Sequence, residues 1–299
     1  MRSGLNSLSL ANDYLALLKP RVMSLVVFTG FAGLVLAPGE LHPVLSLVAV
    51  FCIAFAAGGA GAINMWYDRD IDALMVRTRN RPIPAGRMVP QKALTFGFAT
   101  SVIAVIIMGV AVNWVAAALL AFANAFYVFV YTIWLKRRTP QNIVIGGAAG
   151  AMPPLIGWAA VTGTMGLESF ALFLLIFLWT PPHFWALSLC RTDEYAVAGV
   201  PMLPVVVGKN ATRRQILIYS ILLVPVSLAP LALGIAGAIY ATTAIAMGGG
   251  LLFLAYRIII QRDDGSARRM FQYSIFYLFI LFLVLIAERL WDLAFVPIQ

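Results

Sequence analysis

The stretch "PVLSLVAVFCIAFAAGGAGAINMW", residues 43–66, contains no charged residue. About 20 apolar residues are enough for a helix to cross the hydrocarbon core of a bilayer. The whole chain has a similar character, because 62% of its 299 residues are apolar and only 11% are charged. A soluble domain carries about 25% charged residues. The sequence therefore predicts an all-α polytopic membrane protein, and its long apolar runs do not fit the short alternating strands of a β-barrel.

Nine apolar runs have the length of membrane-crossing helices. Together they predict one transmembrane domain that occupies residues 1–299. The predicted spans are 16–37, 43–66, 93–112, 114–135, 142–162, 168–190, 215–235, 237–256 and 271–292.

The positions of the lysines and arginines test this number of spans. Basic residues collect in cytoplasmic loops, and nine spans place 20 of the 21 lysines and arginines on one side, with only Arg289 near the other. The N-terminus is therefore predicted to be cytoplasmic. The start of the chain, "MRSGLNSLSLANDYLALLKPRVM", is interpreted as a mature cytosolic tail without a signal peptide, which favours a bacterial inner membrane. The net charge of +9 follows from this topology and from attraction to anionic lipids, so no nucleic acid is expected.

The two longest loops, after the second and sixth spans, both lie on the predicted inner side. They are four spans apart, and an even offset gives both the same orientation. This favours a parallel duplication of four-helix units, 16–135 and 142–256, with a ninth helix added. The small residues at 58–62 and 146–151 predict close helix packing.

An acidic cluster follows the second span in "NMWYDRDIDALMVRTRNRPI", residues 64–83. If the helix continues beyond residue 66, Asn64, Asp68 and Asp72 share one face, about 6 Å apart per step, and Asp70 points away. Their position predicts side chains at the boundary between helix and water. Hard oxygen ligands of this kind suit Mg²⁺ bound together with a substrate phosphate. The alternative, a solvated loop in which these acids only pair with nearby arginines, does not explain the helical spacing.

Three arginines follow this acidic face. Arg77, Arg79 and Arg81 alternate with neutral residues and precede Pro82, which predicts an extended loop. Guanidinium groups offer fork-like donors to phosphate oxygens. Carboxylates alone repel a diphosphate, whereas carboxylates with Mg²⁺ beside arginines hold one.

The second long inner segment, residues 180–214, contains further candidates. Pro181 and Pro182 predict a kink or an interruption of the sixth span. His183 lies about 12 Å below the inner surface if the segment is helical, either as a core histidine or in contact with a flat aromatic substrate. The polar candidates for substrate binding here are Arg191, Asp193, Glu194, Tyr195 and Lys209.

The strings "NMWYDRDIDALMVRTRNRPI", "TPPHFWALSL" and "DEYAVAGVPMLPVV" resemble the motifs of UbiA-type intramembrane aromatic prenyltransferases. The resemblance covers nearly the whole chain from "LLKPRVM" onward, and the last two strings are typical of the haem branch of this family. It implies nine helices around a central cavity that opens to the cytoplasmic side. It also implies transfer of a farnesyl group from farnesyl diphosphate to a vinyl group of haem b, through loss of diphosphate and an allylic carbocation.

The same resemblance implies roles for individual residues. Asn64, Asp68 and Asp72 would bind Mg²⁺-diphosphate, and Arg77 and Arg81 would clamp its phosphates. Lys136 and Arg138 would lie nearby. Many members of the family carry a second D-x-x-x-D motif, but here Asp193 is followed four residues later by Val197.

Two other functions remain open at this stage. One is prenyl transfer to a quinone precursor or to chlorophyllide. The other is secondary transport, although transporters place ionisable residues near the bilayer midplane and this chain has almost none there. A downstream haem-modifying enzyme is a further candidate partner.

Overall fold

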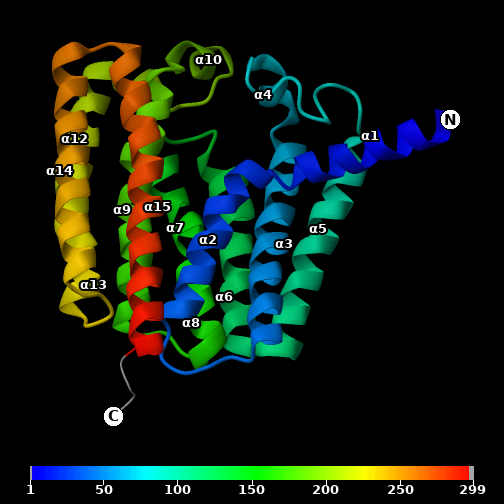
Figure 1. Cartoon of the computed structure of the whole chain (residues 1–299). Coiled ribbons are helices and arrows are strands. Elements are labelled where there is room, and N and C mark those ends of the chain that lie inside the picture. The colour runs from blue at the N-terminus through cyan, green and yellow to red at the C-terminus, as the bar shows by residue number, and fades with distance from the viewer. Residues whose placement is uncertain (1, 296–299) are drawn as a thin grey trace.

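The computed structural model describes residues 2–295, and within them it contains helices and turns but no strand. Within residues 2–295, eight helical segments are long and apolar enough to cross a membrane, and the first segment below gives a ninth only if it is counted together with the helix before it. The segments run side by side through the bundle (Figure 1). The all-α fold is confirmed, and eight to nine spans are compatible with the nine predicted. In chain order they are α2 (Pro20–Leu36), α3 (Pro43–Tyr67), α5 (Pro90–Ile107) continued by η1 (Met108–Val112), α6 (Trp114–Ala125) continued by η2 (Phe126–Leu135), α7 (Asn142–Ala151) with α8 (Pro153–Thr162), α9 (Leu167–Leu189), α12 (Gly208–Ser227) with α13 (Ala229–Ala232), α14 (Ala238–Gln261) and α15 (Asp264–Phe295).

The first span starts later than predicted, because the chain bends before it. Helix α1 (Arg2–Leu17) meets α2 at an angle of 49°. Lys19 adopts a left-handed conformation at the bend, with φ of 51°, and Pro20 then begins α2. A proline disfavours the helical conformation of the residue before it. The segment predicted to be a tail is thus helical from residue 2, and α1 lies across the end of the bundle (Figure 1).

Small residues bring neighbouring helices into close contact. A Cβ atom added to Gly59 of α3 would lie 2.7 Å from the carbonyl oxygen of Gly97 in α5, and the reverse distance is the same. A Cβ atom on Gly147 of α7 would lie 2.9 Å from Cγ2 of Thr180 in α9. These contacts confirm that the small residues at 58–62 and 146–151 permit close packing.

Helix α9 runs without a break through Pro181 and Pro182, so the predicted interruption of the sixth span is wrong. Helices α9, α12, α14 and α15 pack on one another, and their contact faces form the largest apolar core of the protein. Pro181 and Pro182 have no backbone N–H and cannot donate helical hydrogen bonds. Packing of α9 in this core stabilises the helix in spite of that loss.

The two long loops lie at the same end of the bundle (Figure 1). The first contains α4 (Arg69–Leu74), and the second contains α10 (Thr192–Val197) and α11 (Leu203–Val206). An apolar cluster joins them, with Ile71 and Met75 from the first loop and Tyr195, Val200 and Met202 from the second. Each loop therefore helps to position the other.

Candidate active site

The acidic face predicted at the end of the second span is present. Asp68 is the junction between α3 and α4, and the helical hydrogen bonds continue through it, from Asp68 N to Asn64 O at 2.9 Å and from Asp72 N to Asp68 O at 2.8 Å. Asn64 Nδ2 donates to Asp68 Oδ2 at 2.7 Å. Asn64, Asp68 and Asp72 thus follow one another along one face, at the end of the bundle that carries both long loops.

The sequence predicted these side chains at the boundary between helix and water, but the structure buries them. Asp68 is 0% exposed and Asp72 is 3% exposed. Lys136 pairs directly with Asp68, and Arg81 Nη1 lies 2.6 Å from Asp72 Oδ2. A buried carboxylate is costly unless it is paired, so these two cations are what allows the face to be covered.

A third cation reaches the face from a distant part of the chain. Lys19, at the bend between α1 and α2, donates to Asn64 Oδ1 at 2.9 Å. Sequence reasoning treated Lys19 only as a topology signal and missed this contact. The one local signal is its position before the proline that opens the first span.

The π-helical end of the fourth span also contributes to the face. Asn64 Nδ2 donates to Thr132 Oγ1 at 3.1 Å, and Lys136 follows directly after η2, where its N–H bonds to Tyr131 O five residues earlier. This wider helical register is frequent at functional sites. Thr132 was not predicted from the sequence, because it is an ordinary hydroxyl residue inside an apolar span.

The arginine segment is a series of turns rather than the predicted extended loop. Thr78 N bonds to Met75 O at 3.0 Å, and Arg81 N bonds to Thr78 O at 2.9 Å. The buried Thr78 hydroxyl donates to Asp72 O at 2.9 Å, which ties the turns to the acidic face. Arg77 is exposed and makes no hydrogen bond or ion pair within residues 2–295, so its guanidinium group is free to meet a ligand.

Asp70 is exposed, unlike Asp68 and Asp72, and its carboxylate is held by Arg137. Both terminal nitrogens of Arg137 lie 2.7 Å from the Asp70 carboxylate, and these bonds lower the pKa of Asp70. Arg137 also stacks on Tyr67 at 4.8 Å and lies 3.5 Å from Asp68 Oδ1. The predicted neighbour, Arg138, is exposed and makes no side-chain bond in the described chain.

The candidates of the second loop lie apart from this network. Asp193 and Lys209 are exposed, and Glu194 pairs with Arg191 at 2.7 Å. Tyr195 is buried in the apolar cluster that joins the loops. No hydrogen bond or ion pair between described residues connects these side chains to Asn64, Asp68 or Asp72.

His183 is buried in an aromatic stack. Its ring lies 4.2 Å from that of Trp179 and 4.7 Å from that of Phe271, and Nδ1 is 2.7 Å from the Ser274 hydroxyl. Phe271 also lines a cavity of about 500 Å³, together with Arg191, Glu194, Arg268 and Leu187. The histidine is therefore a packed core residue whose stack borders a charged cavity.

The residues of the acidic face fit a hard cation. They provide two carboxylates and an amide, and Asp68 Oδ1 is buried without a hydrogen bond. No group of three His, Cys, Asp or Glu side chains suitable for a metal occurs within residues 2–295. Mg²⁺ is bound in proteins through one or two carboxylates together with water and substrate phosphate, so the two carboxylates of this face have the chemistry of Mg²⁺ ligands.

Comparison with known sequences identifies the class of protein. The UbiA prenyltransferase family matches residues 26–284, and the chain belongs to this family. Among its relatives, the protoheme IX farnesyltransferase of Parvibaculum lavamentivorans is 60% identical over 284 residues, which cover 94% of this chain and 89% of the relative. The protoheme IX farnesyltransferase of Rhodopseudomonas palustris strain BisB5 is 58% identical over 289 residues, covering 94% and 92%.

Solved structures show the same fold. A digeranylgeranylglyceryl phosphate synthase gives a TM-score of 0.77 at 18% identity and covers 93% of this chain and 98% of its own. A UbiA homologue from Archaeoglobus fulgidus, bound to GPP and Mg²⁺, gives 0.66 at 17% identity and covers 92% and 99%. The resemblance inferred from the motifs is confirmed, and the chain is a multi-pass membrane prenyltransferase.

Proposed function

We propose that this protein transfers a farnesyl group from farnesyl diphosphate to a vinyl group of protoheme IX (haem b), giving haem O. The names of its relatives, at 55–60% identity, support the acceptor and the prenyl group. The observation that carries the chemistry is the buried face of Asn64, Asp68 and Asp72, which is covered by cations and sits in an apolar bundle.

The protein's own residues divide the work of diphosphate departure. Asn64, Asp68 and Asp72 would hold Mg²⁺, which when bound supplies positive charge to the leaving group. Arg77 has no partner in the described chain and is available to the phosphates, and Arg81 and Lys136 are already at the face. Preorganised positive charge of this kind stabilises charge that develops in the transition state.

The step itself breaks the bond between C1 of the farnesyl group and its oxygen, and the electron pair leaves with diphosphate. The haem vinyl carbon then bonds to C1, and water adds to the resulting cation as a hydroxyl group with release of a proton. An allylic cation needs walls that are dry and electron-rich. Tyr127 and Tyr131, whose rings are 5.3 Å apart, lie on η2, the element that also brings Thr132 to the acidic face.

We assign the acceptor to the cavity bordered by Phe271. Arg191 and Arg268 line it, and Arg268 is exposed and makes no side-chain bond to any described residue. Guanidinium groups suit the two propionate carboxylates of haem b, and the stack of Phe271 and His183 offers a flat surface to the porphyrin edge. The role of His183 is packing of this surface rather than ligation of iron.

The predicted topology completes the proposal. The protein resides in a bacterial inner membrane, with its N-terminus and both long loops in the cytoplasm, where the positive-inside rule places them. Farnesyl diphosphate then reaches the acidic face from the cytoplasmic side. The docking of a downstream haem-modifying enzyme stays a prediction.

The test is an acceptor competition with purified protein in detergent. Labelled farnesyl diphosphate is offered with haem b, with 4-hydroxybenzoate or with both, and products are separated by chromatography and mass. We expect label on haem alone. Transfer to 4-hydroxybenzoate and not to haem would contradict the proposal and favour the quinone-precursor alternative.

A variant pair tests the acceptor cavity separately. Arg268→Gln is expected to raise KM for haem about tenfold, the effect of losing one charged hydrogen bond, and to leave KM for farnesyl diphosphate unchanged. Arg269→Gln, an exposed neighbour on the same helix, is the matched control. Equal KM values for haem in the two variants would remove Arg268 from the acceptor site.

A further inference from the structure

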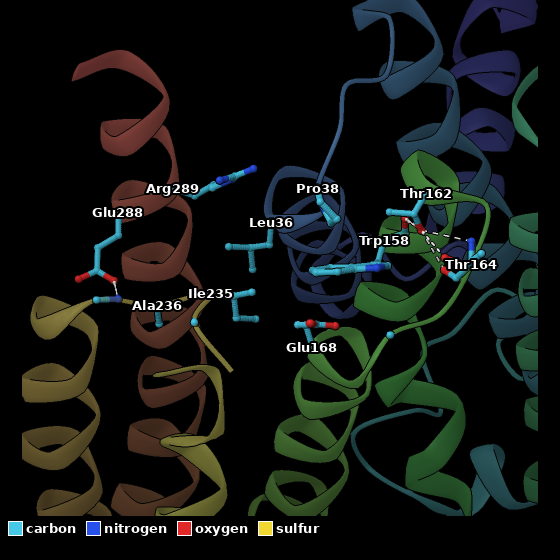
Figure 2. A pocket seen from close by; sticks show the side chains of 13 residues that line it. Leu36, Pro38, Trp158, Thr162, Thr164, Glu168, Ile235, Ala236, Glu288 and Arg289 are labelled. Carbon is cyan, nitrogen blue, oxygen red and sulfur yellow. Dashed lines mark hydrogen bonds between the residues drawn. The ribbon is translucent and has the colours of Figure 1, made fainter. Parts of the chain in front are cut away.

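A second cavity, of about 470 Å³, is lined by residues from the ends of several helices (Figure 2). These helix ends lie at the opposite end of the bundle from α4 and the acidic face (Figure 1). The walls of this cavity are the ends of membrane-crossing helices. Leu36 ends α2, Thr162 ends α8, Glu168 lies in the first turn of α9, and Arg289 lies near the end of α15. Because the helices leave the hydrocarbon core here, the cavity is at the depth of lipid head groups.

Arg289 is an uncommitted cation in this cavity. It is the one basic residue that the span pattern places at this end, and its Nε atom is buried without a hydrogen bond. Its guanidinium group makes no ion pair with any described residue. The adjacent Glu288 does not serve it, because that carboxylate accepts from Gly237 N at 2.6 Å and Tyr240 N at 2.9 Å. A buried donor left unsatisfied is unfavourable, so an acceptor from outside the protein is expected.

The remaining lining determines what kind of molecule fits. Glu168 makes no hydrogen bond or ion pair within the described residues, so the cavity also offers a free carboxylate. Leu36, Ile235 and Trp158 add apolar walls (Figure 2). Since Glu168 and Glu288 outnumber Arg289, a purely anionic ligand is disfavoured, and a ligand that carries both charges is favoured.

We propose that this cavity binds the head group of a zwitterionic aminophospholipid. The phosphate accepts charged hydrogen bonds from Arg289, and the ammonium group donates to Glu168. The glycerol and the first part of the acyl chains lie against Leu36, Ile235 and Trp158. Charged hydrogen bonds to phosphate are among the stronger polar contacts available to proteins, and tryptophan is enriched at this membrane depth.

The test measures lipid binding by delipidated protein in detergent, using native mass spectrometry and the shift of the unfolding midpoint. The probes are phosphatidylethanolamine, phosphatidylglycerol, phosphoethanolamine and inorganic phosphate. The variants are Arg289→Gln and Glu168→Gln, with Arg214→Gln as control, because Arg214 is an exposed arginine at the other end of the bundle.

We expect wild type and Arg214→Gln to retain phosphatidylethanolamine in preference to phosphatidylglycerol. Arg289→Gln should bind phosphatidylethanolamine about tenfold more weakly, the effect of losing a charged hydrogen bond. Glu168→Gln should lose the preference between the two lipids while keeping phosphatidylglycerol binding. This second variant tests the proposal even if Arg289→Gln does not fold.

Three results would overturn the proposal. They are equal retention of phosphatidylethanolamine by the Arg289 and Arg214 variants, no lipid preference in wild type, and a full midpoint shift with inorganic phosphate or phosphoethanolamine alone. The last result would show a plain anion or head-group site that does not need the lipid.

Discussion

The two long loops occupy the same end of the bundle and touch each other, yet their charges are arranged differently. In the first, Asp68 and Asp72 are buried and paired with Lys136 and Arg81. In the second, Asp193 is exposed and has no partner in the described chain, and its neighbour Glu194 is paired with Arg191 beside the α15 cavity.

This difference suggests that the two loops have different roles. The first loop concentrates oxygen ligands and cations at one buried point, which suits a metal-bound diphosphate. The second loop supplies apolar contacts through Tyr195 and a cationic edge through Arg191. If the halves arose by duplication, which stays a prediction, only one of them kept a full acidic face.

The largest expected effect on kcat comes from comparing the replacement of one aspartate in each loop. Asp68→Asn should lower kcat for farnesyl transfer roughly 10²- to 10³-fold, the scale of losing a preorganised electrostatic contact, because it removes a proposed metal ligand and the partner of Lys136. Asp193→Asn should change kcat less than about threefold, within the scatter of a neutral surface substitution. Similar losses in both variants, with folding confirmed by circular dichroism, would erase the difference between the loops.

The contact between the loops predicts the next effect, on stability. Ile71 is 7% exposed in the joining cluster, whereas Leu74 on the same short helix is 58% exposed. Ile71→Ala should destabilise by about 2 kcal/mol, because it leaves a cavity, and Leu74→Ala should change the unfolding midpoint little. In the double variant Ile71→Ala with Tyr195→Ala, the loss of stability should be smaller than the sum of the two single losses, as is usual for residues in contact. Strict additivity would show that the loops are held independently.

A smaller effect on binding is expected from the free cations of each loop. Arg77→Gln should raise KM for farnesyl diphosphate about tenfold by removing a charged hydrogen bond to phosphate. It should leave the unfolding midpoint unchanged, because Arg77 makes no bond within residues 2–295. Lys209→Gln, its exposed counterpart in the second loop, should change neither value. An unchanged KM in the Arg77 variant would remove it from the diphosphate site.

The smallest effect concerns Asp70, which shares the first loop but not its acidic face. Its bonds with Arg137 lower the pKa of Asp70, so its contribution to stability is present above the unfolded pKa of about 3.9. That contribution is lost as the pH falls through the lower folded value. Asp70→Asn should cost less than about 1 kcal/mol at pH 7, because the pair is solvent-exposed.

The difference between Asp70→Asn and wild type should vanish in strong acid, and farnesyl transfer by the variant at pH 7 should stay normal. Unfolding midpoints measured as a function of pH, together with a turnover assay, check both statements. A loss of activity as large as that of Asp68→Asn would place Asp70 in the site.

Much of the fold could be predicted, because lipid imposes strong rules on sequence. Spans must be long and apolar, and charge marks their sides. The spacing of Asn64, Asp68 and Asp72 depends only on local helical geometry, so it too was readable. The bend at Lys19 was missed, because the apolar residues before Lys19 and after Arg21 were counted as one continuous span.

The covering of the acidic face was only partly predictable, because it depends on tertiary contacts. The family resemblance placed Lys136 near the site, but the contact of Lys19 with Asn64 forms only when the bundle packs. The same reasoning explains Tyr195, whose polar end suggested a ligand contact while its ring packs between the loops. Side chains placed by distant helices leave no periodic signal in their own segment.

The most direct test is metal binding in the presence of an unreactive analogue, farnesyl thiodiphosphate. Mn²⁺ replaces Mg²⁺ as a paramagnetic probe, and equilibrium dialysis against protein-free micelles measures the ion retained by the protein. The account predicts about one Mn²⁺ per chain in wild type and in Asp193→Asn, since both keep the single two-carboxylate set. It predicts almost none in Asp68→Asn and Asp72→Asn. Full retention by both of these variants, or its loss in Asp193→Asn, would contradict the account.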